Sequence, residues 1–185
     1  MMSEFDRHFM SMALREAEKA AADGEVPTGC VIVEPAPLEG GREGEFDPNP
    51  CTARILARAH NQPEMLQDAT AHAEMLRDAT AHAEMLALTA AASVKGAWRL
   101  SGTRLYVTKE PCPMCAGAII LARVPTVIWG VSDPKRGGGT VFNIFGHPGI
   151  NHHPEIVTGV MEAESLLVLR DFFRRRREES GKTGK

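Results

Sequence analysis

Hydrophobic residues recur at helical spacing near both ends of the chain. In residues 3–23 most apolar positions are three or four apart, which predicts an amphipathic helix. Ser3 and Asp6 form a capping start for this helix, and Gly24 ends it. Residues 161–179 repeat the pattern and predict the last helix. The apolar face of the helix predicted at 3–23 consists of Phe5, Phe9, Met12, Ala13, Ala17 and Ala20.

Short apolar segments between these helices predict strands. Residues 27–33 (PTGCVIV) are almost wholly apolar, so they are expected to form a strand buried on both faces. Further strands are predicted at 54–59, 103–108, 125–131 and, at an edge, 155–160. A helix separates the segments 103–108 and 125–131, so these two strands should be parallel. The pattern predicts an α/β fold with a mixed central sheet of about five strands.

The 185 residues suit one domain, 1–185, with a full core. Residues 34–52 are rich in proline, glycine and acidic side chains, which indicates a hairpin insertion. No apolar stretch reaches the roughly 18 residues of a membrane span, and the acidic residues 1–6 do not resemble a secretory signal. Four cysteines, two of them a candidate metal pair, favour a reducing compartment, and we expect a cytoplasmic protein.

Charge is distributed unevenly along the chain. The net charge of −3 argues against nucleic-acid binding over the whole surface. Residues 170–185, however, hold seven basic and three acidic side chains. This basic C-terminal tail is either a nucleic-acid-binding surface or a solvated helix end whose arginines complement the helix dipole.

The strongest chemical signal is Pro111-Cys112-Pro113-Met114-Cys115, read together with His82-Ala83-Glu84. Two cysteines at the start of a helix favour the thiolate form. Two thiolates and one imidazole make a three-ligand zinc site whose fourth position is left for water, as in catalytic sites. Zinc lowers the pKa of such a water to about 7, and Glu84 is close enough to act on it. A redox pair or a structural zinc site is the alternative, and neither requires Glu84.

A tandem repeat complicates the choice of histidine. The sequence DATAHAEML occupies residues 68–76 and again 78–86, with a period of ten residues. Both copies contain a His/Glu pair, His72 with Glu74 and His82 with Glu84. Ten residues of helix fall about 80° short of whole turns, so both histidines cannot easily face one metal.

The chain resembles the bacterial tRNA-specific adenosine deaminase family of the cytidine-deaminase-like fold, over residues 3–177. His-x-Glu followed by Pro-Cys-x-x-Cys is the signature of zinc nucleobase deaminases. The run CPMCAGAI at 112–119 and the tail FFRRRR at 172–177 are similar to the tRNA enzymes in particular. Shorter matching segments are 25–29, 106–108, 133–135 and 151–152. The resemblance implies a three-layer α/β/α fold.

The resemblance also implies a reaction, namely hydrolytic deamination of adenosine to inosine at the wobble position of tRNA anticodons. The implied zinc ligands are His82, Cys112 and Cys115, with one Zn²⁺ per subunit of a homodimer. Glu84 would transfer protons while a zinc-activated water attacks C6 of the purine. The family's substrate-binding positions match Asn61, Ala83, Asp133, Lys135, Phe172, Phe173 and Arg174. The implied partner is the tRNA anticodon stem-loop, with no membrane.

Spacing decides between the two histidines. Asn61 to His72 spans 11 residues, the family-like upstream spacing, whereas His82 to Cys112 spans 30 residues, the family-like downstream spacing. We favour His82, because a loop absorbs ten extra residues more easily than a packed helix and strand. Two other functions are weighed against the tRNA enzyme: a zinc deaminase of a free base or nucleoside (guanine or cytosine type), and a non-catalytic zinc or redox module.

Overall fold

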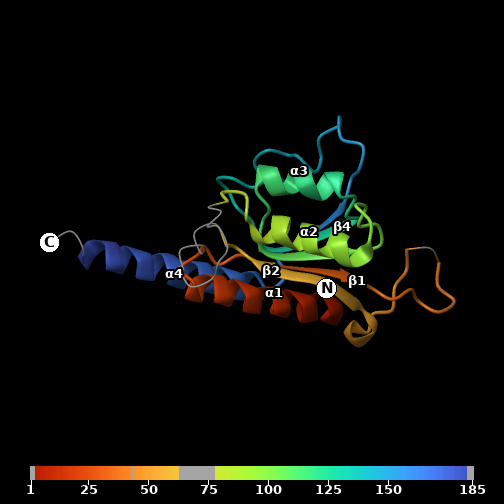
Figure 1. Cartoon of the computed structure of the whole chain (residues 1–185), viewed down its shortest axis with the longest axis horizontal. Helices are drawn as coiled ribbons and strands as arrows, with labels where there is room; N and C mark the ends of the chain where they lie inside the picture. Colours follow the sequence, from red (N-terminus) through yellow and green to blue (C-terminus); the bar gives the residue numbers. More distant parts are fainter. Residues whose placement is uncertain (1–2, 43, 63–77, 183–185) are drawn as a thin grey trace, which may run out of the picture.

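The computed structural model describes residues 3–42, 44–62 and 78–182 (Figure 1). Within them a five-stranded sheet has the order β2-β1-β3-β4-β5. β1 pairs antiparallel with β2 and β3, whereas β4 lies parallel to both β3 and β5. The mixed sheet, the parallel pair and the edge strand were predicted correctly. The strands are β1 (Gly29–Glu34), β2 (Arg54–His60), β3 (Arg104–Lys109), β4 (Thr126–Val131) and β5 (Glu155–Thr158).

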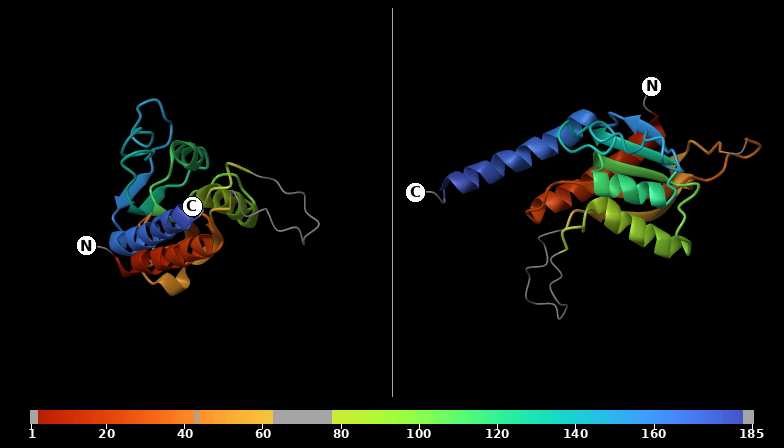
Figure 2. Two further views of the ribbon diagram at one scale, coloured as in Figure 1. Left: turned by 90° about the vertical axis from the view of Figure 1, so that its left-hand side faces the viewer. Right: turned by 90° about the horizontal axis from the view of Figure 1, so that it is seen from above.

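Helices cover both faces of the sheet, which confirms the three-layer α/β/α architecture (Figure 1; Figure 2). Helices α1 (Glu4–Ala22) and α4 (Glu162–Lys182) lie side by side on one face. Helices α2 (Ala83–Lys95) and α3 (Pro113–Leu121) cover the other. The Ser3 hydroxyl accepts a hydrogen bond from the Asp6 N–H at 3.0 Å, so α1 begins with the predicted cap. No helix among the described residues is long and apolar enough to cross a membrane.

Alternating side chains of the inner strands build two separate cores. Because successive residues of a strand point to opposite faces, Val31 and Val33 pack with α1, whereas Cys30 and Ile32 join the cluster under α2 and α3. Burial on both faces explains the almost unbroken apolar sequence of β1.

The insertion at 34–52 packs at one end of the sheet. The Phe46 ring lies 4.9 Å from the Phe5 ring, and the Arg104 guanidinium lies 4.9 Å from the centre of the Phe46 ring. A short 3₁₀ helix, η1 (Pro50–Thr52), then leads into β2. A cavity of about 540 Å³ opens under this segment, and no histidine or cysteine is among the described residues that line it.

Asp6 anchors α1 to the sheet, and we expect Asp6→Ala to lower the free energy of unfolding by about 3 kcal/mol. Its carboxylate accepts hydrogen bonds from the Tyr106 hydroxyl at 2.8 Å and from the Arg104 guanidinium at 3.1 Å. The substitution leaves both donors in a largely buried position without their acceptor. Urea denaturation measures the change.

Asp171→Ala is the matched control. Asp171 pairs with Arg174 on the surface of α4, and such exposed pairs contribute less than about 1 kcal/mol. Equal losses for the two variants would contradict the anchoring role of Asp6.

Candidate active site

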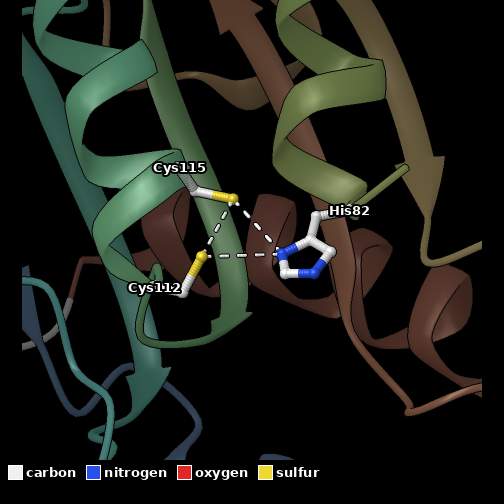
Figure 3. Close-up of side chains that lie close together, drawn as sticks. All are labelled: His82, Cys112 and Cys115. Atoms are coloured by element: carbon white, nitrogen blue, oxygen red, sulfur yellow. Dashed lines mark hydrogen bonds between the residues drawn. The ribbon is translucent and has the colours of Figure 1, made fainter. Parts of the chain in front are cut away.

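The starts of two helices meet at one end of the sheet. β3 ends at Lys109, and Cys112 then becomes the N-cap of α3, with Cys115 in the first turn. His82 is the N-cap of α2. Figure 3 shows the imidazole pointing between the two sulfur atoms. The predicted positions of Cys112 and Cys115 at the start of a helix are confirmed.

The three side chains have the spacing of a tetrahedral zinc site. The His82 Nδ1 atom lies 3.6 Å from the Cys112 sulfur and 3.5 Å from the Cys115 sulfur, and the sulfur atoms are 3.6 Å apart (Figure 3). Standard zinc bond lengths in a tetrahedron place two sulfurs about 3.8 Å apart and a sulfur and a nitrogen about 3.6 Å apart. The residues therefore fit a zinc ion by distance as well as by donor chemistry.

Local interactions favour one thiolate. The hydrogen bond with Cys115 has the largest effect and lowers the pKa of Cys112 to about 4. Burial opposes this shift, whereas the hydrogen bond with His82 adds to it. The same contact and burial raise the pKa of Cys115. A cation bound between the two sulfurs would deprotonate the second thiol too, because a metal ion inverts this local charge balance.

Glu84 lies in the first turn of α2 and is only 3% exposed. Burial raises the pKa of its carboxyl group to about 7. Its Oε2 atom is buried and has no hydrogen-bond partner within the described part of the chain. A buried acceptor without a partner requires a specific reason, and a reacting water or substrate proton would supply one.

Hydrogen bonds between the end of β2 and the start of α2 fix the register of His82. The Asn61 Oδ1 atom accepts the Ala83 N–H at 2.9 Å, and the Gln62 N–H donates to the Ala81 carbonyl at 3.1 Å. These two hydrogen bonds bring Asn61 and Gln62 beside Ala83 and Ala81. The first copy of the repeat, with His72 and Glu74, lies outside the described residues, whereas His82 of the second copy reaches the cysteines.

The site opens into a cleft of about 240 Å³. Pockets for drug-sized ligands measure about 300–1,000 Å³, so this cleft suits a single base. Asn61 and Glu84, both predicted site residues, are in its wall. Arg136 also lines it and lies in the loop 133–139, which follows β4 and was expected to border the site. Lys109 lines it too and was not predicted. The complete lining is Val26, Thr28, Asn61, His82, Glu84, Lys109, Glu110, Cys112 and Arg136.

Hydrogen bonds hold the loop 133–139, which follows β4. The Asp133 carboxylate pairs with Lys109 and accepts the N–H groups of Lys135 and Arg136 at 2.9 and 3.1 Å. Gly137 and Gly138 are buried. The side chain of Asp133 is thus occupied within its own loop, whereas Lys135 is exposed.

The two aromatic residues of the C-terminal tail have different environments. Phe172 is 5% exposed and packs inward, whereas Phe173 is 44% exposed. Phe172 lacks the open ring face that stacking on a base needs, so it anchors α4 instead. A surface groove of about 560 Å³ follows this part of α4 and is lined by Leu166, Leu169, Arg170, Asp171, Phe173, Arg174 and Arg177.

Comparison with known proteins identifies the family. Residues 3–131 match the cytidine and deoxycytidylate deaminase zinc-binding region. The tRNA-specific adenosine deaminase of Bacillus subtilis (strain 168) is 41% identical over 175 residues, which cover 94% of this chain and 92% of that protein. The chain belongs to the tRNA-specific adenosine deaminase family.

Solved structures agree with this family. One solved structure comes from a study of A-to-I editing by tRNA:A34 deaminases at the wobble position of transfer RNA. Its sequence is 36% identical to this chain, and the two align with a TM-score of 0.69 over 88% of this chain and 99% of that one. The guanine deaminase of Nitrosomonas europaea aligns with a TM-score of 0.65 at 19% identity, over 90% of this chain and 83% of that one. At that identity the similarity shows only that the two chains share a fold.

Proposed function

We propose that this protein is a zinc-dependent hydrolase that converts adenosine to inosine at the wobble position of tRNA anticodons. The observation that carries the proposal is the convergence of His82, Cys112 and Cys115 beside Glu84, whose buried Oε2 atom has no hydrogen-bond partner among the described residues. Membership of the tRNA-specific adenosine deaminase family then favours adenosine in tRNA over a free base.

His82, Cys112 and Cys115 would hold one zinc ion per subunit. When three protein ligands bind a zinc ion, the ion supplies a water that is nucleophilic at neutral pH. The chain prepares this site by placing both sulfurs at the positive end of α3. Asn61 contributes indirectly, because its bond to the Ala83 N–H fixes the backbone that follows His82.

Glu84 moves the protons of the reaction. Its Oε2 atom takes a proton from the attacking water and delivers it to the purine ring nitrogen. A second transfer through the same carboxylate lets ammonia leave. Burial, which brings the carboxyl pKa to about 7, suits a group that both accepts and donates protons near neutral pH.

Asn61 would orient the base, and Ala83 would hold the Asn61 side chain in place through its N–H. Within the described residues the Asn61 side chain has one hydrogen bond, accepted at Oδ1, which leaves its Nδ2 amino group to donate to the purine. Ala83 carries a methyl group that is fully buried next to Glu84. A base in this cleft must first leave its stack, and bases of a single-stranded loop do so at low cost.

The exposed half of α4 would bind the anticodon stem-loop through Phe173 and Arg174. This part of α4 lies beside the end of α1, because Arg175 and Ala22 line one groove. Val26, which follows α1 in the chain, lines the cleft. Aromatic rings stack on unpaired bases, and arginines contact phosphates. Asp133 would support the binding loop, and Lys135 would contact the RNA backbone.

Replacing Arg174 and Arg177 with alanine should weaken stem-loop binding and reduce its salt dependence. Loss of two phosphate contacts lowers the slope of log Kd against log salt by up to about 1.4. Fluorescence anisotropy at several salt concentrations measures the slope. The control replaces Arg7 and Arg15, which are exposed on α1. An equal change in both double variants would show that general charge, not α4, attracts RNA.

A homodimer in the cytoplasm completes the proposal. Large apolar side chains are exposed on the sheet face covered by α2 and α3, among them Leu121 at 71%, and such patches are typical of interaction surfaces. A reducing compartment keeps the two cysteine ligands available. Sedimentation equilibrium is expected to give twice the chain mass, and a monomer at micromolar concentration would contradict the dimer.

The substrate class is tested with the zinc-loaded protein and four substrates: an anticodon stem-loop with adenosine at the wobble position, free adenosine, guanine and cytidine. We expect product from the stem-loop alone. Turnover of a free base or nucleoside instead would keep the zinc chemistry and refute the tRNA assignment. Failure on all four by a zinc-loaded chain would refute the deaminase function.

A further inference from the structure

Glu110 is the most heavily hydrogen-bonded carboxylate beside the cleft. It is 2% exposed and follows the last residue of β3. Its Oε1 atom accepts the N–H groups of Gly139 at 3.0 Å and Thr140 at 2.7 Å. Its Oε2 atom accepts the Asp133 N–H at 2.7 Å and the Thr140 hydroxyl at 2.9 Å. All four donors belong to the single segment 133–140, so this one side chain holds both ends of the loop.

The three glycines of this loop allow that contact. A Cβ atom on Gly137 would lie 2.4 Å from the Glu110 carboxyl carbon, and one on Gly138 would lie 2.7 Å from Ala116 and 2.9 Å from the Pro111 carbonyl oxygen. The Gly138 N–H also donates to that carbonyl at 2.8 Å. The glycines therefore serve close packing against Glu110 and the start of α3 rather than chain flexibility.

The loop presents positive charge at the mouth of the cleft. Arg136 is exposed and is part of the cleft lining, and Lys135 beside it is exposed as well. Their backbone N–H groups are held by Asp133, whose own N–H is held by Glu110. Burying the Glu110 carboxylate is compensated by charge-assisted hydrogen bonds. The loop backbone is therefore held in place beneath two exposed cationic side chains.

We propose that Glu110 is a positioning residue, which fixes the loop 133–140 so that Arg136 meets a phosphate of the nucleotide entering the cleft. The inference rests on the proposed function, because a free base or nucleoside has no phosphate to offer Arg136. Glu110 acts on substrate binding through the loop and takes no part in proton transfer.

Amide hydrogen exchange tests the loop contact without any substrate. In Glu110→Gln the loop loses its charge-assisted hydrogen bonds, so exchange in a peptide covering 133–140 should accelerate at least about tenfold. Peptides from β3 and α2 should keep their rates, and the zinc content should not change. The control is Glu155→Gln, an exposed glutamate on the edge strand β5. Unchanged exchange in the loop of Glu110→Gln would overturn the proposal.

Kinetics on the stem-loop then test the link to Arg136. Glu110→Gln and Arg136→Ala should each raise KM about tenfold, the equivalent of one such hydrogen bond, while kcat changes less than about threefold. Adding Arg136→Ala to Glu110→Gln should raise KM by less than about twofold further, because both remove the same contact. Fully additive effects would overturn the link, as would a fall in kcat together with loss of zinc.

Gly137→Ala is a second test of the loop contact, which is needed if the Glu110 variant fails to fold. It keeps the carboxylate but forces the loop away from it, so it should reproduce both the faster exchange and the higher KM. Normal exchange and KM in Gly137→Ala would overturn the proposal. A wild-type chain that binds no stem-loop would refute the proposed function and the role of Arg136, and the exchange rates alone would then decide whether Glu110 holds the loop.

Discussion

Glu84→Gln is expected to keep its zinc and to lower kcat on the stem-loop about a thousandfold. The amide has the same shape as the carboxylate, but it cannot take a proton from water or return one to the purine. General acid–base catalysis contributes about a hundredfold to ten-thousandfold, and Glu84 is proposed to act in more than one proton transfer. Single-turnover kinetics, with the zinc content measured on the same sample, give the effect.

Glu164→Gln is the matched control for this experiment, because Glu164 is exposed in the first turn of α4. It should retain full activity. A zinc-loaded Glu84→Gln variant with near wild-type kcat would show that the buried carboxylate does not transfer protons. The deaminase mechanism would then have no general base.

His82→Ala is expected to weaken zinc binding more than about a hundredfold, whereas His72→Ala should leave it unchanged. Substitutions that only support a metal ligand typically cost about tenfold to a hundredfold in affinity, so loss of a ligand itself should exceed that range. The repeat provides this pair of variants within one chain, since both histidines lie in the same local sequence. Competition with a chromophoric chelator measures the affinity.

The opposite result for the two histidines would place the metal on the first copy of the repeat. Loss of zinc in both variants would mean that the repeat as a whole supports the site. Only the pattern in which His82→Ala alone loses zinc agrees with the distances of 3.5 and 3.6 Å from its Nδ1 atom to the two sulfurs.

Local sequence patterns were sufficient to predict most of the fold. The unbroken apolar run of β1 follows from its position between β2 and β3 with helices on both sides. The parallel pairing of β3 and β4 follows from the helix between them. Boundaries were less exact: the last helix was expected to end near residue 179, and α4 continues to Lys182.

Cysteine spacing was sufficient to place two sulfurs on one helix turn, because that placement depends only on local geometry. Pairing the cysteines with His82 depends on a contact between residues about thirty positions apart, and the repeat offered two candidate histidines. The choice of His82 rested on the cost of inserting residues into packed structure. The hydrogen bonds of Asn61 and Gln62 to Ala83 and Ala81 join the end of β2 to the start of α2.

Long-range side-chain contacts explain what sequence reasoning missed. The hydrogen bonds from the loop 133–140 to Glu110 join residues more than twenty positions apart, and three consecutive glycines alone indicate flexibility. The burial of Phe172 had a signal, however. Ser165, Leu169 and Phe172 follow each other at helical spacing and are all buried, which leaves Phe173 on the outer side.

The central claim is tested most directly by incubating the zinc-loaded protein with a full-length tRNA that has adenosine at the wobble position, in water labelled with heavy oxygen. Nuclease digestion and mass spectrometry then locate every inosine. The account predicts inosine at the wobble position alone, with the labelled oxygen on C6. Inosine at other adenosines, inosine without the label, or an unmodified tRNA would contradict it.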